Sequence, residues 1–448
     1  IWRVPVSGGT PARALVGFAG ILRLSPDGTR FYMGQGTIRS VPVEGGEPAP
    51  VMFSAQIEED PAAVRRAAFD QAWRLLRDGF YDEKMHGVDW DAVYARYSAV
   101  LDEIVTDDDW LLFLSEMVGE LNASHVGASL RDRGEPAVTT AYLGFWFDYD
   151  HPGPGLAITE ILRDGPADGL DPPLRPGQYV LAIDGNDVTA SEGLFRQLNG
   201  AVGRTVELLV NDRPTRERAR SVRITLISRQ RWDSLFYEHQ VARARERVDR
   251  LSGGRLAYVH IRSMDQPSLA RFQRELRSLA FEKEGLIIDV RWNGGGRIHD
   301  ELLALLAPRV HAYETPRGGL AMTQPFGAYD RPMALLINQG SASDAEVFPN
   351  GFRVNRLGKI IGVPTSGGVI GTMEQRLLDG RTTWRIPRTG WTTLEGRNME
   401  NWGVPPDIYV ERLPADYAED RDPQLERAVE ELLKEIGRPK RPGSRNGG

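Results

Sequence analysis

Apolar residues change their spacing several times along the chain, and each spacing predicts a different kind of element. Within residues 54–130 they recur every three or four positions, as at Ala72, Leu76 and Phe80, which is the period of an amphipathic helix. A second helix is predicted behind Thr106, because threonine is a good N-cap and the three aspartates that follow favour the positive end of the helix dipole. This segment is therefore expected to be helical.

Residues 140–228 are typical of a small β domain, with short apolar or alternating runs separated by turns. The opening Leu143–Phe147 and the run Leu174–Val188, which reads LRPGQYVLAIDGNDV, resemble a PDZ domain. Such domains usually capture a peptide by adding it as a strand to a sheet edge. A small β barrel that serves only as a spacer is the alternative interpretation.

The C-terminal half alternates short, near-continuous apolar runs with helical stretches from about Val241 onward. Continuous apolar runs indicate strands that are buried on both faces of a sheet. We therefore expect an α/β layer, in which active sites gather where strands end in loops. The predicted strands are Leu256–Ile261, Gly285–Val290, Pro332–Asn338 and Lys359–Val363, and the predicted helices cover 267–281, 299–306 and 423–436.

The N-terminal residues contain a weak repeat. Val4–Pro11 recurs as Val41–Pro48 with a shift of about 37 positions, a period that suits one blade of a β-propeller. Between the copies, Leu22–Tyr32 predicts two strands joined by a Pro-Asp-Gly turn. Two copies cannot close a propeller, so its other blades would lie upstream of Ile1 in a longer protein. A pair of unrelated Gly-Gly turns is the alternative.

Composition narrows the candidate chemistry. The chain has no cysteine, which excludes disulfides, thiolate metal sites and cysteine nucleophiles and is compatible with a reducing cytosol. The net charge of -7 is modest, and Lys and Arg are scattered among acids, so no nucleic-acid partner is predicted. No apolar run approaches the roughly 18 residues of a membrane-spanning helix, and no signal peptide is recognisable. We expect peptides or small molecules as ligands and no membrane partner.

One candidate for chemistry follows the strand that ends near Ile337. The segment Asn338–Ala342 consists of small and polar residues and leads through Ser343 into a predicted helix. A side chain at this turn would lie beside a helix N-terminus, whose amides favour an anion, so Ser343 is a candidate nucleophile. Ser343 and Glu346 also have the spacing of a capping box, and by itself the local sequence favours that structural role.

A triple glycine, Gly294–Gly296, follows the strand that ends at Val290. Because these residues have no side chain, their amides can approach a ligand closely, as an oxyanion site requires. A phosphate-binding loop is the competing interpretation. It fits poorly, because no Gly-Lys-Ser or Gly-Lys-Thr follows and the glycine spacing differs from a dinucleotide fingerprint.

A serine nucleophile needs a base, and the chain has seven histidines. His125 directly follows Ser124 and lies where the second predicted helix runs out, whereas none of the other histidines has a serine before it. This spacing does not select His125 by itself.

Several motifs resemble, in their order and separation, those of the tricorn proteases, the cytosolic relatives of the carboxyl-terminal processing peptidases. The resemblance covers nearly the whole chain. It implies a crotonase/ClpP-like α/β catalytic layer with a helical segment, a PDZ-like β insert and the remnant of an N-terminal β-propeller. The motifs are Ser124-His125, DVRWNGGG (289–296), NQGSASDAE (338–346), GVPTSGGVIG (362–371) and NMENWGVPPD (398–407).

Together, the patterns and the resemblance predict a multidomain protein of α/β and β parts. The predicted regions are the end of a β-propeller (1–53), the helical part of the catalytic region (54–139), the PDZ-like domain (140–228), the α/β catalytic domain (229–415), and a C-terminal helix with a disordered tail (416–448).

The resemblance also implies roles for the candidate residues. Ser343 would be the nucleophile and His125 the general base, while Ser124 and Glu400 would orient that base, an indirect version of the third member of a catalytic triad. Without the resemblance, Glu400 would be interpreted as a surface residue.

Further roles follow from the same resemblance. The amides of Gly296 and Asp344 would form the oxyanion hole, with Gly295 as the alternative if the turn is shifted by one residue. Glu314 lies where the resembling enzymes place an acid in the specificity pocket, which would favour a basic residue before the cut. No metal or organic cofactor is required.

One position separates the two related groups. The processing peptidases use a Ser-Lys dyad, and their lysine lies in a segment that corresponds to Gly362–Gly368. Here the lysine position holds Gly368. Because this position has no lysine, the base of a Ser-Lys dyad is missing. The resemblance to the histidine-based tricorn type therefore implies that His125 is needed as the base.

The resemblance implies a cytoplasmic serine peptidase that cleaves short peptides, such as those the proteasome releases, through an acyl-enzyme. It also implies a homo-hexameric ring and an upstream propeller part of the same protein as partner. Two alternatives are a crotonase-like acyl hydrolase or isomerase, for which a PDZ-like insert would have no use, and an inactive PDZ-bearing scaffold, which would keep the strands but lose the Ser, His and Glu set.

Overall fold

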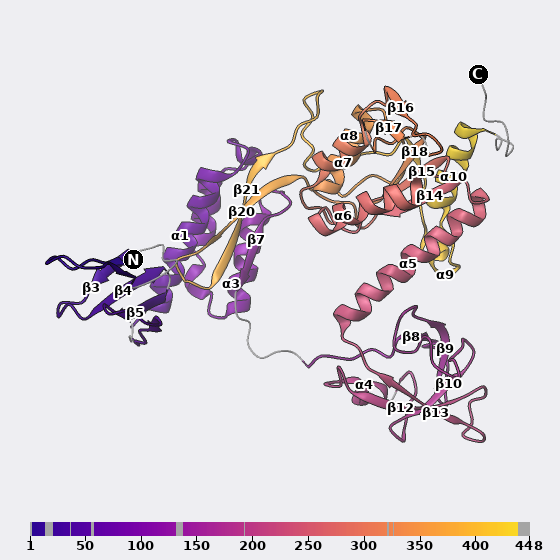
Figure 1. Ribbon diagram of the computed structural model, residues 1–448, viewed down its shortest axis with the longest axis horizontal. Helices are drawn as coiled ribbons and strands as arrows, with labels where there is room; N and C mark the ends of the chain where they lie inside the picture. Colours follow the sequence, from indigo (N-terminus) through magenta and orange to yellow (C-terminus); the bar gives the residue numbers. More distant parts are fainter. Residues whose placement is uncertain are drawn as a thin grey trace. The chain divides into compact units, whose positions relative to one another are not determined.

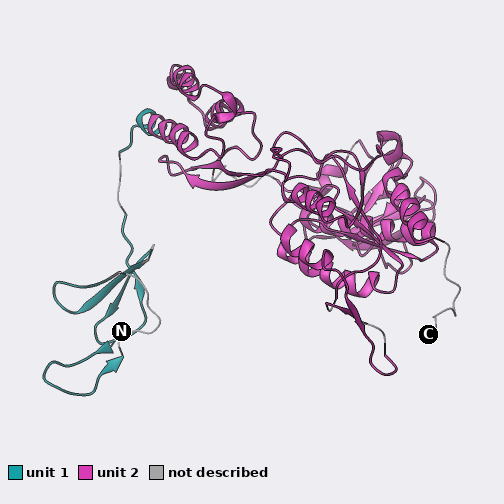
Figure 2. Cartoon of the chain, turned by 90° about the horizontal axis from the view of Figure 1, so that it is seen from above, with its two compact units in different colours: residues 1–64 teal, residues 65–448 magenta. Residues whose placement is uncertain are grey.

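The computed structural model describes residues 2–13, 21–35, 37–54, 58–130, 138–191, 193–319, 322–325 and 327–437. The chain divides into two compact units, residues 1–64 and 65–448, which Figure 2 colours separately. The predicted disordered tail after the last helix lies almost wholly outside the described residues.

The first unit consists of short antiparallel strands. The predicted hairpin is confirmed, because the Gly28 amide donates to the Ser25 carbonyl at 2.9 Å in the turn that joins two paired strands. That these strands end a propeller stays a prediction. The four-stranded sheet has the order β3 (Ile21–Leu24), β4 (Arg30–Gln35), β5 (Thr37–Pro42), β6 (Ala49–Pro50), and β1 (Trp2–Arg3) pairs separately with β2 (Ala12–Arg13).

The helical region comprises α1 (Pro61–Gly79), α2 (Trp90–Ser98) and α3 (Asp107–Gly119), with 3₁₀ turns at Met85–Gly87 and Leu101–Glu103. The two predicted helices are confirmed as α1 and α3. Thr106 caps α3 as predicted: its hydroxyl accepts from the Asp109 amide at 3.1 Å, and the Asp109 carboxylate accepts from the Thr106 amide at 3.3 Å.

Strands from distant parts of the sequence complete the helical region. β7 (Gly127–Leu130) pairs antiparallel with β21 (Thr382–Gly390), and β21 pairs with β20 (Ile370–Arg376). Figure 1 shows these strands beside α1 and α3. The sequence patterns do not predict the β20–β21 hairpin.

Packing explains why this hairpin belongs to the helical region. Trp384 and Ile386 of β21 are fully buried in one cluster with Phe69 of α1 and Leu114 of α3. A hydrophobic face on the helices therefore has its partner in a segment that the sequence places in the α/β domain. The helical region has no closed core without it.

Residues 145–225 form the predicted β domain. Its sheet has the order β13-β12-β10-β9-β8, and β11 pairs with β10. The resemblance to a PDZ domain stays a prediction. The elements are β8 (Phe145–Phe147), β9 (Leu156–Ile161), β10 (Tyr179–Ile183), β11 (Asn186–Asp187), α4 (Leu194–Leu198), β12 (Thr205–Asn211) and β13 (Arg220–Thr225).

The long helix α5 (Arg229–Ser252) follows the β domain and is not among the predicted helices. It begins at the predicted domain boundary, where the Ser228 hydroxyl accepts from the Arg231 amide at 3.2 Å. Its first turns pack on the β domain, with the ring of Trp232 centred 5.0 Å from that of Trp146.

A parallel sheet with the order β14-β15-β18-β19-β22 forms the centre of the C-terminal region. The first four strands are those predicted, and the predicted α/β layer is confirmed. Its strands are β14 (Leu256–His260), β15 (Gly285–Asp289), β18 (Met333–Ile337), β19 (Gly358–Gly362) and β22 (Ile408–Tyr409). Its helical elements are α6 (Gln266–Glu275), a π-helical turn (Leu276–Ala280), α7 (His299–Leu306), α8 (Asp344–Val354), α9 (Pro414–Ala418) and α10 (Pro423–Ile436).

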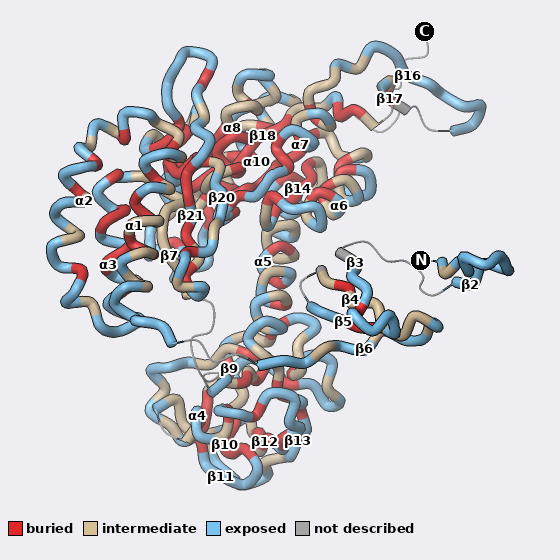
Figure 3. The backbone as a smooth tube through the Cα atoms, turned by 90° about the vertical axis from the view of Figure 1, so that its left-hand side faces the viewer, coloured by how far each residue is buried: buried red, intermediate tan, exposed pale blue. Residues whose placement is uncertain are grey.

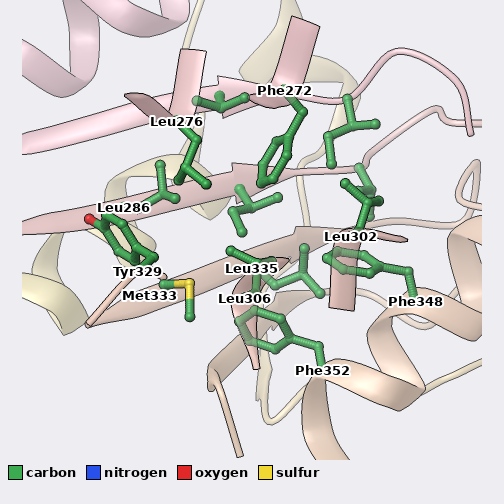
Figure 4. Close-up of a cluster of buried hydrophobic side chains, with 14 of the residues drawn as sticks. Phe272, Leu276, Leu286, Leu302, Leu306, Tyr329, Met333, Leu335, Phe348 and Phe352 are labelled. Atoms are coloured by element: carbon green, nitrogen blue, oxygen red, sulfur yellow. The ribbon is translucent and has the colours of Figure 1, made fainter. Parts of the chain in front are cut away.

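Helices cover both faces of this sheet. Leu335 of β18 packs with residues of α6, α7 and α8, such as Phe272 and Phe348 (Figure 4). The neighbouring Leu336 faces the opposite way and packs with residues of α5 and α10, and Figure 3 shows buried residues gathered along β14, β18 and α10. Burial on both faces is the reason why these strands are apolar without alternation.

Trp384→Ala tests whether the β20–β21 hairpin stabilises the helical region rather than the parallel sheet. Because Trp384 is fully buried, the substitution should lower the free energy of unfolding by about 3–5 kcal/mol and increase amide hydrogen exchange first in α1 and α3. Leu378→Ala in the same hairpin is the control, since that side chain is 64% exposed and its loss should change stability by less than about 0.5 kcal/mol. Equal effects of the two variants would contradict the packing described.

Candidate active site

A cavity of 1110 Å³ brings together segments from several parts of the second unit. Its walls come from the glycine turn after β15, the N-termini of α7 and α8, the start of β20, and β21. Of the predicted site residues, those that line it are His125, Gly295, Gly296, Ser343 and Asp344.

Ser343 lies in the turn between β18 and α8 in a strained backbone conformation. Its φ is 57° and its ψ is −120°, which a residue with a side chain adopts at a cost of about 1–3 kcal/mol. The Ser343 amide donates to the Gly368 carbonyl at 2.9 Å and to the Glu346 carboxylate at 3.1 Å. These contacts hold the turn so that Ser343 forms part of the cavity wall.

Glu346 holds the turn that carries Ser343. It is fully buried and accepts from the Thr365 hydroxyl at 2.6 Å and from the Gly367 and Gly368 amides at 2.7 and 2.8 Å. Burial raises the pKa of this carboxyl, against the opposing effect of these donors. Ser343 and Glu346 are paired as the predicted capping box requires: the Glu346 carboxylate accepts from the Ser343 amide at 3.1 Å, and the Glu346 amide donates to the Ser343 carbonyl at 2.8 Å.

Ser124 and Glu400 hold His125 through its Nδ1 atom. Its Nδ1 lies 2.7 Å from the Ser124 hydroxyl, which donates to Glu400 Oε2 at 3.0 Å. Glu400 also accepts from the Ser124 amide at 2.5 Å and from the Val369 amide at 2.8 Å. Glu400 is only 5% exposed, so interpreting it as a surface residue is wrong.

The donors and acceptors of this chain set the tautomer of His125. A carboxylate can only accept, so the Ser124 hydroxyl gives its proton to Glu400 and accepts a hydrogen bond through its oxygen. The donor to that oxygen is then Nδ1–H of His125. In the neutral ring this leaves Nε2 without a proton and able to act as a base.

Burial also favours the neutral form of His125. The pKa of this imidazole lies below its ordinary value because burial penalises the charged ring, and Arg385 adds to the shift, while the charge of Glu400 opposes it. The ring is therefore mostly uncharged at neutral pH.

The glycine turn lines the cavity and uses one of its amides in a hydrogen bond within the turn. The side chain of the fully buried Asn293 accepts from the Gly295 amide at 2.9 Å. Within the described part of the chain, neither the Gly296 amide nor the Asp344 amide has a hydrogen-bond partner. Gly296 and Asp344 are therefore better placed than Gly295 to bind an anion.

The side chain of Asp344 ties the two segments that carry these amides. Its Oδ2 accepts from the Ile298 and His299 amides at 2.7 and 3.1 Å, and its Oδ1 accepts from Nδ1 of His299. The bond to Asp344 raises the pKa of His299, whose ring packs edge-on against Trp391 at 5.3 Å. In the sequence, no local pattern distinguishes His299 from the other histidines.

Glu314 is not among the residues that line the cavity. It lies in the hairpin of β16 (Ala312–Glu314) and β17 (Met322–Gln324), is exposed, and accepts from the Gln324 amide group at 2.9 Å. The acidic side chains that line the cavity besides Asp344 are Asp300 and Glu301, and the basic ones besides the histidines are Arg297, Arg385 and Arg388.

Gly368 lies directly beside Ser124. A Cβ added at this position would come within 3.1 Å of both Cβ and Oγ of Ser124. A residue with a side chain at this position would therefore require Ser124, whose hydroxyl contacts His125, to shift by a few tenths of an ångström.

The described ranges hold no cluster of three or more His, Asp or Glu side chains that could bind a metal ion. None of the helices in these ranges has the length and apolar character needed to cross a membrane.

Two family models match parts of this chain. Residues 255–410 match peptidase family S41, and residues 61–119 match the tricorn protease C1 domain. The first covers the α/β layer and the β20–β21 hairpin, and the second covers the helical region. The chain is therefore similar to a peptidase over one segment and to a tricorn C1 domain over another.

Comparison with individual proteins shows which peptidases this chain resembles. Tricorn protease homolog 1 of Streptomyces coelicolor is 34% identical over 382 residues, which are 83% of this chain and 35% of that protein. A solved structure, the crystal structure of the tricorn protease, has a TM-score of 0.79 at 26% identity and covers 93% of this chain and 41% of the solved one. Carboxyl-terminal-processing peptidase 2 of Arabidopsis thaliana is 23% identical over 79% of this chain and 70% of that protein. The resemblance to the tricorn proteases is thereby confirmed, and this chain spans 35% of the length of the Streptomyces relative.

The protonation of His125 can be measured directly. Because burial lowers its pKa, the His125 ring signals in an NMR titration should have a midpoint below the ordinary value of 6.5. Glu400→Gln should lower the midpoint further, because removing the carboxylate charge removes the effect that opposes the shift. A wild-type midpoint at or above the ordinary value would contradict the burial of this ring.

Gly295→Ala and Gly294→Ala form a matched pair within the glycine turn. A Cβ at Gly295 would lie 2.6 Å from Cβ of Ser343, and Gly295 has a φ of +100°, whereas a Cβ at Gly294 would meet no atom within 4 Å. Gly295→Ala should lower the free energy of unfolding by about 1–3 kcal/mol, and Gly294→Ala by less than about 0.5 kcal/mol. Denaturant unfolding measures both, and equal losses would show that the turn is not packed on Ser343.

Proposed function

We propose that this chain is a serine peptidase in which Ser343 attacks the peptide carbonyl and His125 serves as the general base. The observation that carries the proposal is that both residues line one cavity while Glu400 orients the histidine through Ser124. The match to peptidase family S41 supports the same class of reaction.

The tautomer of His125 suits the first step. As Oγ of Ser343 bonds to the carbonyl carbon, its proton passes to Nε2, and the carbonyl oxygen becomes an oxyanion. The imidazolium then gives the proton to the leaving amine, the C–N bond breaks, and an acyl-enzyme remains. Water, deprotonated by the same histidine, attacks the ester, releases the acid and restores the Ser343 hydroxyl.

The Gly296 and Asp344 amides would bind the oxyanion. An oxyanion hole is effective when its donors are fixed before the reaction, because no reorganisation is then needed in the transition state. The Asp344 carboxylate supports this role. It accepts from the amides at the start of α7, which begin two residues after Gly296, and so links the glycine turn to Asp344 itself. We propose that Asp344 contributes its backbone to the oxyanion and its side chain to the spacing of the two donors.

We propose short peptides as the substrates. The cavity offers apolar contacts from Val347, Val369 and Ile370 and charges of both signs on its walls, which suits mixed peptide side chains better than one uniform ligand. The name of the Streptomyces relative, a tricorn protease homolog, supports the same class. A preference for a basic residue would depend on Asp300 or Glu301 rather than on Glu314, because the former line the cavity.

The finer predictions about the whole protein rest on the resemblance to tricorn proteases. They are the cleavage of proteasome products, a cytoplasmic location, a homo-hexameric ring, an upstream propeller, and a PDZ-like domain that binds peptides. Of the two alternatives, an inactive scaffold would have no need for the hydrogen bonds from Glu400 to His125. A crotonase-like acyl hydrolase is less favoured, because the family matches are to a peptidase and a tricorn domain.

Ser343→Ala should lower the turnover of fluorogenic peptides by about 10⁴-fold or more and abolish labelling by a fluorophosphonate, with the unfolding midpoint unchanged. Ser341→Ala is the control two residues away. The Ser341 hydroxyl is fully buried and donates to the Val290 carbonyl at 2.9 Å. Ser341→Ala should therefore lower the free energy of unfolding while the folded variant still turns over the peptide. If Ser343→Ala keeps full activity and Ser341→Ala loses it, the assignment of the nucleophile is wrong.

A further inference from the structure

A second chain of hydrogen bonds ends at the backbone amide of Glu400, whereas the chain to His125 starts at its carboxylate. The Tyr81 hydroxyl lies 2.6 Å from Nε2 of His86, and Nδ1 of His86 lies 2.8 Å from the Leu121 carbonyl. Nδ2 of Asn398 donates to the Tyr81 oxygen at 3.0 Å, and Oδ1 of Asn398 accepts from the Glu400 amide at 3.1 Å. The helical region is thereby bonded to the backbone of the residue that orients the base.

In the neutral form of His86, the partners give each hydrogen bond of this chain one direction. The Leu121 carbonyl can only accept, so Nδ1 of the neutral ring carries the hydrogen and Nε2 accepts from the Tyr81 hydroxyl. The Glu400 amide can only donate, so the side chain of Asn398 must face it with its oxygen and face Tyr81 with its nitrogen. Tyr81 both gives and receives a hydrogen bond through a single group, its hydroxyl.

The packing around Tyr81 fixes its position. The Tyr81 ring lies edge-on to that of His86, with centroids 5.3 Å apart, and a Cβ added at Gly390 would come within 2.4 Å of the Tyr81 ring. His86 has a left-handed backbone, with φ at 53°, and its amide donates to Asp82 at 2.9 Å. A strained backbone that its surroundings hold in place often marks a functional region.

We propose that Tyr81 is a positioning residue for the general base, held in turn by His86. Tyr81 fixes Asn398, Asn398 fixes the backbone of Glu400, and the carboxylate of Glu400 orients His125 through Ser124. This inference rests on the proposed function, because it assigns Tyr81 to the same site. A second contact, from Nδ2 of Asn401 to the Asn122 carbonyl at 2.7 Å, ties the same loop to the exit of α3 and keeps the loop attached when Tyr81 is changed.

Tyr81→Phe tests the role, because it removes the hydroxyl and keeps the ring. Tyr94→Phe is the matched control, since the Tyr94 hydroxyl donates to Asp70 at 2.9 Å within the same helical region and is not bonded to the site. The full chain should be labelled by a fluorophosphonate roughly tenfold or more slowly in Tyr81→Phe, because misplacing a base by a fraction of an ångström reduces the rate steeply. For a fluorogenic peptide, kcat should fall with KM changed less than about twofold. Tyr94→Phe should leave labelling and kcat within about twofold of the wild type.

Two His86 variants separate positioning from a general loss of structure. The side-chain oxygen of Gln can accept from Tyr81 as Nε2 does, so His86→Gln should keep most of the wild-type labelling rate. His86→Leu cannot accept a hydrogen bond and should react as slowly as Tyr81→Phe. Equal rates for the two His86 variants, or for Tyr81→Phe and Tyr94→Phe, would overturn the inference.

A readout that does not depend on turnover distinguishes this inference from the proposed function. In ¹⁵N NMR, the wild-type His125 ring should be protonated at Nδ1, and Tyr81→Phe should shift it towards a mixture of tautomers while Tyr94→Phe does not. If the wild type is not labelled but these shifts occur, the proposed function fails and the positioning role stands. If Tyr81→Phe leaves the His125 ring signals unchanged, the positioning role is wrong even in an active peptidase.

Discussion

The antiparallel pairing of β7 with β21 is the interaction on which the candidate site depends. β7 begins two residues after His125, and β21 emerges from the α/β layer that carries Ser343. The pairing and its packing bring together residues as far apart in sequence as Trp110 and Thr382, which are 272 positions apart and joined by a hydrogen bond. The entropy cost of closing so long a loop grows only slowly with its length, and the burial of Trp384 among the helices offsets it. This contact, together with the bonds from Ser124 to Glu400, brings His125 and Ser343 to the same cavity.

Three buried carboxylates then set the finer geometry. Asp344 joins α8 to the start of α7, Glu346 joins α8 to the loop at 365–368, and Glu400 joins the exit of α3 to the start of β20. Each accepts at least three hydrogen bonds from amides or side chains, as a buried carboxylate must if the cost of removing it from water is to be offset. The segments of the site are thus held together by polar contacts that would each be costly to break.

The space around Ser124 bears on the base of the proposed reaction. Gly368 lies so close to Ser124 that a Cβ at this position would require Ser124 to shift by a few tenths of an ångström. Such a shift would disturb the hydrogen bond between the Ser124 hydroxyl and His125. A glycine at this position therefore suits the proposed role of His125.

Local patterns in the sequence determined much of the fold. The Thr106 cap, the turn at Gly28 and the doubly buried strands depend on residues a few positions apart, so periodicity and turn chemistry were sufficient to predict them. The motifs around Ser124, Ser343 and Glu400 were recognisable from the resemblance, and their residues do come together. Only the tertiary structure decided that the β20–β21 hairpin completes the helical region, that Asn293 accepts from the Gly295 amide, that His299 bonds to Asp344 and Tyr81 to Asn398, and that Glu314 does not line the cavity. These features depend on contacts between segments far apart in the chain. Such contacts produce no local periodicity or residue spacing from which they could be predicted.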